Sequence, residues 1–187
     1  MLTSLLSLTI WLPILAGGIV LASAKANSPS MSKWLALFGS IAGFIAALGV
    51  FFQFDAGSVA PQFAYKTAWV DNLSIFYAIG VDGISMPFVV LNSFITIFVV
   101  IAAWEVITEK PAMYLGAFLL MSGLINGAFA AQDAILFYVF FEAMLIPMYI
   151  IIGVWGGPRR VYASIKFFLY TLLGSLLLLI ALLYLHS

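Results

Sequence analysis

The stretch from Ala134 to Trp155 contains a single charged residue, Glu142, close to its middle. A helix of about 22 residues measures roughly 33 Å, which is enough to cross the hydrocarbon core of a bilayer. A carboxylate held near the membrane midplane costs about 2.5–3.5 kcal/mol on insertion scales. We therefore expect Glu142 either to carry a function inside the membrane or to bond a neighbouring helix.

The surroundings of Glu142 favour a function in proton transfer. A low dielectric disfavours the charged carboxylate, so the group is suited to exchange protons. Pro147 has no N–H for the carbonyl of Ala143, which leaves a backbone acceptor free beside the glutamate. Tyr138 and Tyr149, at i−4 and i+7, share its helix face and add hydroxyl groups to it. The alternative is that Glu142 only joins two helices.

The composition of the whole chain is also that of a membrane protein. Hydrophobic residues make up 65% of the sequence and charged residues 7%, whereas soluble domains carry about 25% charge. This composition predicts an all-α integral membrane protein. The absence of cysteine excludes thiolate metal sites. The sequence shows neither a nucleophile–base pair nor a phosphate-binding loop, so it gives no support for an independent enzyme. Six transmembrane helices are expected at about 5–22, 34–54, 83–104, 112–131, 134–155 and 165–184.

Basic residues predict the orientation of these helices. Six of the seven fall in the connections after the first, third and fifth helices, and only Lys66 falls on the other side. Connections rich in lysine and arginine face the cytoplasm. Both termini and the long loop 55–82 are therefore expected outside. The six inner residues are Lys25, Lys33, Lys110, Arg159, Arg160 and Lys166.

The outer loop 55–82 has the pattern of a β-hairpin. Aromatic or aliphatic residues alternate with smaller or polar ones on both sides of Asp71-Asn72, a pair that favours turns. We expect strands at roughly 63–70 and 73–80. An isolated hairpin is marginal in water, so its aromatic face should meet lipid headgroups or a neighbouring subunit.

Several residues have an expected place in the bundle. Asp82 and Asp133 are predicted to cap the third and fifth helices. The fourth helix contains Gly123-xxx-Gly127 together with Ser122 and Asn126, a small and polar stripe that should be buried.

The side chain of Lys166 has two possible positions. It either extends to the headgroups or points into the bundle as a charge partner for Glu142. Tyr170, Gly174 and Ser175 are expected on the same face of the sixth helix as Lys166.

Three segments carry a resemblance to a known family. They read FYVFFEAMLIPMY at 137–149 with Trp155-Gly156 behind it, VDGIS at 81–85, and KFFLYTLLGS at 166–175. Nearly the whole sequence resembles chain M (chain 4 in mitochondria) of the proton-pumping NADH:quinone oxidoreductases, or respiratory complex I. The run EAMLIPMY distinguishes this chain from the related chains L and N.

The resemblance implies the N-terminal portion of an antiporter-like subunit of about fourteen helices in two inverted repeats. In that family the glutamate matching Glu142 is a translocation residue and works with lysines on later helices. Such a chain is a subunit of an enzyme without redox chemistry of its own. The other subunits bind NADH, FMN, iron–sulfur clusters and quinone.

The resemblance also implies a location and partners. The expected location is the bacterial inner membrane, with the mitochondrial inner membrane second. The expected partners are chains L and N and the lipid bilayer, and no nucleic acid is expected. Two other functions stay open: a subunit of a multisubunit cation/proton antiporter, and a non-transporting structural membrane fragment.

Overall fold

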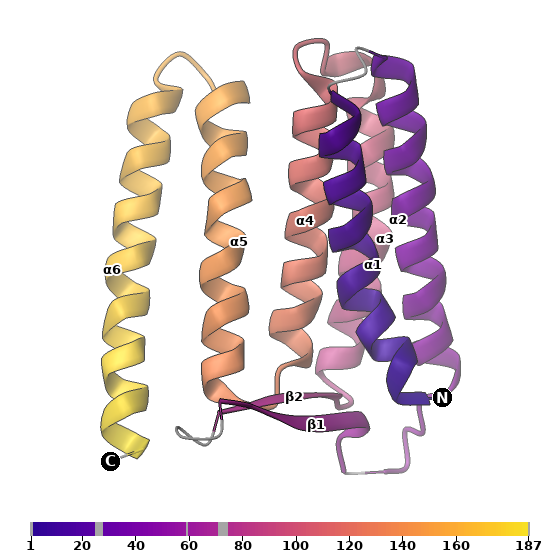
Figure 1. Cartoon of the computed structure of the whole chain (residues 1–187), viewed down its shortest axis with the longest axis vertical. Helices are drawn as coiled ribbons and strands as arrows, with labels where there is room; N and C mark the ends of the chain where they lie inside the picture. Colours follow the sequence, from indigo (N-terminus) through magenta and orange to yellow (C-terminus); the bar gives the residue numbers. More distant parts are fainter. Residues whose placement is uncertain (1, 25–27, 59, 71–74, 187) are drawn as a thin grey trace.

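The structure is a computed structural model that describes residues 2–24, 28–58, 60–70 and 75–186. Within these residues, six helices are long and apolar enough to cross a membrane (Figure 1). They are α1 Leu2–Ser23, α2 Pro29–Phe52, α3 Ser85–Val106, α4 Pro111–Ala130, α5 Ala134–Trp155 and α6 Arg160–His186. The expected six-helix membrane fold is therefore confirmed.

The observed helix boundaries differ from the expected ones by at most a few residues. The bounds of α5 coincide with the expected 134–155. α2 begins at Pro29, five residues before the expected start, because proline has no N–H to lose and its fixed φ suits the first helical position. α6 likewise begins at Arg160 rather than near 165, since a helix can extend past the hydrocarbon core into the interface.

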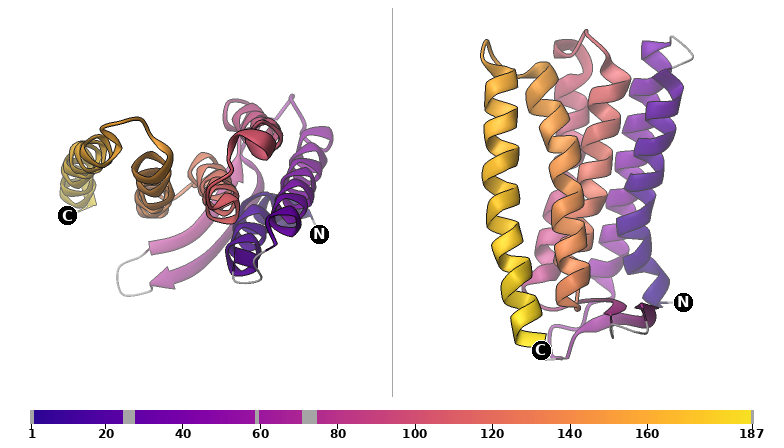
Figure 2. Two further views of the ribbon diagram at one scale, coloured as in Figure 1. Left: turned by 90° about the horizontal axis from the view of Figure 1, so that it is seen from above. Right: turned by 60° about the vertical axis from the view of Figure 1, so that its left-hand side comes forward.

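The helices form a bundle with one open edge. α1 packs against α2 and α4, α3 packs against α2 and α4, α5 packs on α4, and α6 packs on α5. Figures 1 and 2 show α6 at the edge of the molecule, and both termini at the end that carries the hairpin. The end of α1, the start of α2 and the connections between α3 and α4 and between α5 and α6 lie at the opposite end (Figure 1). Which end faces the cytoplasm stays a prediction.

The expected β-hairpin is present. Strands β1 Gln62–Val70 and β2 Ile75–Val81 pair antiparallel, with Tyr65 opposite Ile79 and Thr67 opposite Tyr77. The predicted turn residues Asp71 and Asn72 lie outside the described residues.

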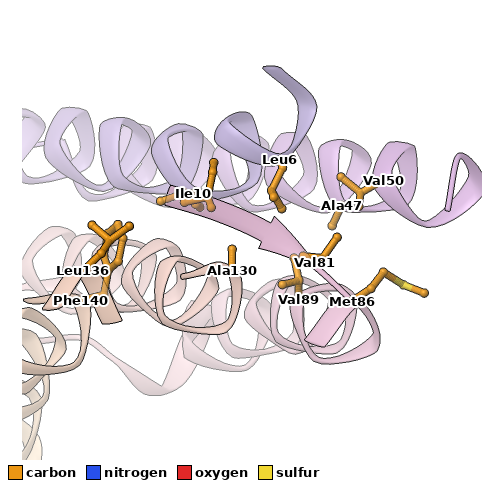
Figure 3. Close-up of a cluster of buried hydrophobic side chains, with 11 residues drawn as sticks. Leu6, Ile10, Ala47, Val50, Val81, Met86, Val89, Ala130, Leu136 and Phe140 are labelled. Atoms are coloured by element: carbon orange, nitrogen blue, oxygen red, sulfur yellow. The ribbon is translucent and has the colours of Figure 1, made fainter. Parts of the chain in front are cut away.

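The hairpin is fixed to the bundle at the connection between α4 and α5. The Gln132 N–H donates to the Ala78 carbonyl at 2.8 Å, and its side-chain amide donates to the Gly80 carbonyl at 3.1 Å. Strand β2 also joins a hydrophobic core that contains residues of five helices (Figure 3). The hairpin therefore closes the end of the bundle. The buried residues are Leu6, Ile10, Ala47, Val50, Ile79, Val81, Met86, Val89, Ala130, Leu136 and Phe140.

Both predicted carboxylate caps make hydrogen bonds to the backbone. Asp133 accepts from the N–H groups of Ile135 and Leu136 at the start of α5. Asp82 stands three residues before the first residue of α3, and its carboxylate accepts from the N–H groups of Ile84 and Ser85. These bonds, above all the one from the Ser85 N–H, hold the pKa of Asp82 below its ordinary value.

The expected stripe of small residues in α4 is buried and contacts two neighbouring helices. A Cβ placed on Gly123 would lie 2.5 Å from the backbone oxygen of Ile10 in α1, and one on Gly127 would lie 2.6 Å from the ring of Phe140 in α5. The glycines therefore let α4 approach helices on two sides.

We expect Gly123→Ala to lower the free energy of unfolding by about 1–3 kcal/mol, because the new methyl group meets backbone that cannot rotate away. Gly18→Ala is the matched control. A Cβ there meets nothing within 4 Å, so the change should be neutral or slightly stabilising. Titration with a denaturing detergent measures both. Equal effects would show that helix propensity, not close approach, decides the result.

Candidate functional site

The carboxylate of Glu142 lies in the middle of α5, in a partly buried position. Its Oε1 is buried and has no hydrogen-bond partner, which is true of no other buried side-chain nitrogen or oxygen in the described part of the chain. Buried polar atoms are normally bonded, and an exception calls for an explanation such as a chemical role. The helix is continuous across Pro147, which is buried.

Tyr138 lies beside Glu142, as the i−4 spacing predicts. Its hydroxyl has two polar neighbours, the Glu142 carboxylate and the side chain of Ser175 in α6. Ser175 is 4% exposed, and its hydroxyl donates to the Leu172 carbonyl at 3.0 Å. A phenol between a carboxylate and a hydroxyl can exchange a hydrogen bond with either one.

Tyr149 contributes differently. Its ring packs edge-to-face on Phe168 of α6, with the ring centroids 5.6 Å apart. One turn further along, Gly153 lies against the buried Ser164 of α6. Tyr149 therefore helps to hold α5 and α6 together near the glutamate.

Lys166 lies on the opposite face of α6 from Ser175. The two residues are nine positions apart, which is a rotation of about 900°, or half a turn beyond two full turns. Lys166 is exposed, and its ammonium lies 5.8 Å and 5.7 Å from the ring centroids of Tyr162 and Tyr170. The expectation that Lys166 and Ser175 share a face is wrong, and the structure does not bring Lys166 to Glu142.

A second polar cluster, which the sequence indicated only in part, lies between α1, α3 and α4. The side-chain amide of Asn92 donates to the carboxamide oxygen of Asn126 at 2.8 Å and to the Ser122 carbonyl at 2.9 Å. Thr96 donates to the Ser122 hydroxyl at 2.8 Å. Asn92 therefore faces protein, and the cluster consists of neutral groups.

Asn126 completes a bond that α1 cannot make for itself. The residue is fully buried, and its amide nitrogen donates to the Thr9 carbonyl at 2.9 Å. Thr9 stands four residues before Pro13 in α1, so the missing N–H of Pro13 leaves that carbonyl free. Pro13 shows in the sequence that the Thr9 carbonyl lacks its helical donor, but nothing in the sequence indicates which residue donates to it instead.

The sequence of the chain is similar to those of known membrane proteins. Residues 131–187 match the family model described as NADH:quinone oxidoreductase/Mrp antiporter, TM. The chain is 42% identical to NADH-quinone oxidoreductase subunit M of Rickettsia conorii, over 98% of this chain and 38% of that protein. It is 41% identical to subunit M of Rhodobacter capsulatus, over 95% of this chain and 35% of that protein. The resemblance found in the sequence is confirmed.

Solved structures agree with the sequence comparison. The chain superposes on a chain of respiratory complex I from Thermus thermophilus with a TM-score of 0.82 and 31% identity, over 98% of this chain and 35% of that one. A chain of an archaeal membrane-bound sulfane sulfur reductase gives 0.80 at 19% identity, over 94% of this chain and 35% of that chain, which shows the fold alone. The chain thus spans little more than a third of the relatives that it matches.

Proposed function

We propose that the chain is a subunit M of the NADH-quinone oxidoreductase type, because it is 42% identical to such a subunit over 38% of that subunit's length, and that it moves protons across the membrane, with Glu142 as the relay. The observation that carries this proposal is the buried Oε1 of Glu142, which has no partner among the described residues. A carboxylate that only joined two helices would use its oxygens to bond them. A relay needs a free lone pair to receive a proton.

Neighbouring residues have supporting parts in this proposal. Tyr138 lies next to Glu142 and offers a hydroxyl that can donate to the carboxylate. Tyr149 keeps α6 against α5 through Phe168. Lys166 lies on the outer face of α6 and would be a charge partner of Glu142 only through a rearrangement of α6. Its exposed position favours the alternative that it reaches the headgroups.

The wider assignment follows from the relatives. We propose that the chain works as a subunit of an NADH-quinone oxidoreductase in the bacterial inner membrane, beside chains of the L and N type. NADH, FMN, iron–sulfur clusters and quinone would then be bound by other subunits. The redox reaction would supply the energy, and this chain would supply part of the proton path.

A cation/proton antiporter subunit is the second candidate. The matched family model is described by both names, oxidoreductase and Mrp antiporter. Measuring proton uptake into vesicles that contain the assembled complex separates the two. NADH should drive uptake if the chain serves an oxidoreductase, whereas an imposed sodium gradient should drive it if the chain serves an antiporter. Exchanging Glu142 for glutamine should abolish whichever uptake is observed.

The orientation makes a separate prediction. Single cysteines placed at Ser30 and Ser58 should react with a membrane-impermeant thiol reagent from opposite sides. Both positions are exposed and lie at opposite ends of α2. The basic connections predict that Ser30 faces the cytoplasm. Reaction of both cysteines from one side would contradict the membrane span assigned to α2.

A further inference from the structure

A groove at the end of α5 and α6 opposite the hairpin, the end expected to face the cytoplasm, has the features of a lipid site. It has a volume of about 540 Å³ and lies around the connection between the two helices. Its described lining residues include three cations, Arg159, Arg160 and Lys166, and no carboxylate. We propose that this groove binds the headgroup of an anionic phospholipid.

The lining of the groove combines two kinds of residue. Ile152, Ala163 and Phe167 are apolar, and Arg159, Arg160 and Lys166 are cationic. A phospholipid needs this combination, because its phosphate is charged while its glycerol and acyl chains are apolar. Basic pockets between transmembrane helices on the cytoplasmic side are suited to anionic headgroups.

Lys166 is placed to contribute its charge at this level. It stands six residues, or about 9 Å, inside the first residue of α6. Its ammonium lies 5.8 Å and 5.7 Å from the ring centroids of Tyr162 and Tyr170. A lysine at this depth extends towards the headgroups, and Lys166 lines the groove together with Arg160.

A second groove at the same end of the bundle gives an internal comparison. It has a volume of about 410 Å³ and is lined by residues of α1, α2 and the start of α4. Among its described lining residues, Lys110 is the one cation. The two grooves are similar in size, and among their described lining residues the first has three cations and the second has one. The first should therefore bind an anionic lipid more strongly.

The test uses the intact membrane complex that contains this chain, reconstituted with photoactivatable phosphatidylglycerol or photoactivatable phosphatidylcholine. Mass spectrometry then locates the cross-links. We expect phosphatidylglycerol to label residues 152–167 about fivefold more than phosphatidylcholine. Each substitution removes one of the three cations that attract the charged headgroup, so Arg160→Gln and Lys166→Gln should each lower this ratio roughly twofold.

Lys110→Gln is the matched control, since it removes one charge at the same end of the bundle but from the other groove. It should leave the labelling ratio at 152–167 unchanged. Equal labelling by the two lipids, an equal loss in the control, or no labelling at all would each overturn the proposal. Loss of the preference in millimolar inorganic phosphate would also overturn it, because the groove would then recognise free phosphate rather than a lipid.

Discussion

Replacing Glu142 by glutamine is expected to lower proton pumping and the coupled quinone reduction of the assembled complex by about a hundredfold, the lower end of what loss of a proton-transferring group costs. Glutamine keeps the shape of the side chain and most of its hydrogen bonding, but it cannot take up and release a proton. Assembly should therefore remain intact. Native gels report assembly, and a pH-sensitive dye in inverted vesicles reports pumping.

Glu109→Gln is the matched control, because it makes the same chemical change at an exposed position outside the membrane spans. It should leave pumping unchanged. Moving the carboxylate by combining Glu142→Ala with Ala143→Glu turns it by about 100° around α5, so activity should not return. A structural role for Glu142 predicts the reverse pattern, in which Glu142→Gln is silent and Glu142→Ala lowers assembly. Normal pumping by assembled Glu142→Gln would refute the relay.

Asn126→Ala is expected to cost about 2–3 kcal/mol of the free energy of unfolding. The substitution removes three hydrogen bonds, to Asn92, Ser93 and the Thr9 carbonyl. Such bonds between membrane helices average about 0.6 kcal/mol each and reach about 1.7 kcal/mol. The Thr9 carbonyl would in addition remain buried without a donor. Ser40→Ala is the control, because that buried hydroxyl bonds only the Leu37 carbonyl of its own helix.

A double-mutant cycle isolates the share of this free-energy cost that comes from the bond to the Thr9 carbonyl. Pro13→Ala restores an N–H that can bond this carbonyl within α1. Asn126→Ala should therefore cost about 1 kcal/mol less in the Pro13→Ala background than in the original chain. Detergent titration of the four proteins gives the value. An equal cost in both backgrounds would show that Asn126 does not act through the carbonyl that Pro13 leaves free.

The fold could be predicted in large part because its signals are local. Long apolar runs gave six helices, period-two alternation gave the hairpin, and single carboxylates gave the cap of α5 and a residue that bonds the backbone just before α3. Each signal depends on a few consecutive residues and on the chemistry of the bilayer. The start of α2 was missed by five residues because the apolar run begins later than the helix that proline opens.

The candidate site was harder to predict because its contacts join distant segments. The position of Glu142 came from the sequence, but the proximity of Tyr138 to Ser175 depends on how α6 rotates against α5. Ser175 was wrongly assigned to the face of Lys166, because nine positions turn a helix by about 900° and place the two residues on opposite faces. Which of these faces packs against α5 depends on contacts between the helices, and no local pattern specifies them.

The bond between Asn126 and Thr9 has a consequence for the synthesis of the chain. The donor follows the acceptor by 117 residues, which at about 5–20 residues per second takes roughly 6–23 s to make. During that interval α1 would expose an unpaired carbonyl if it entered the lipid alone, and lipid offers no donor to it. α1 should therefore stay beside the insertion machinery until α4 emerges, so that the first and fourth helices enter the bilayer as a pair.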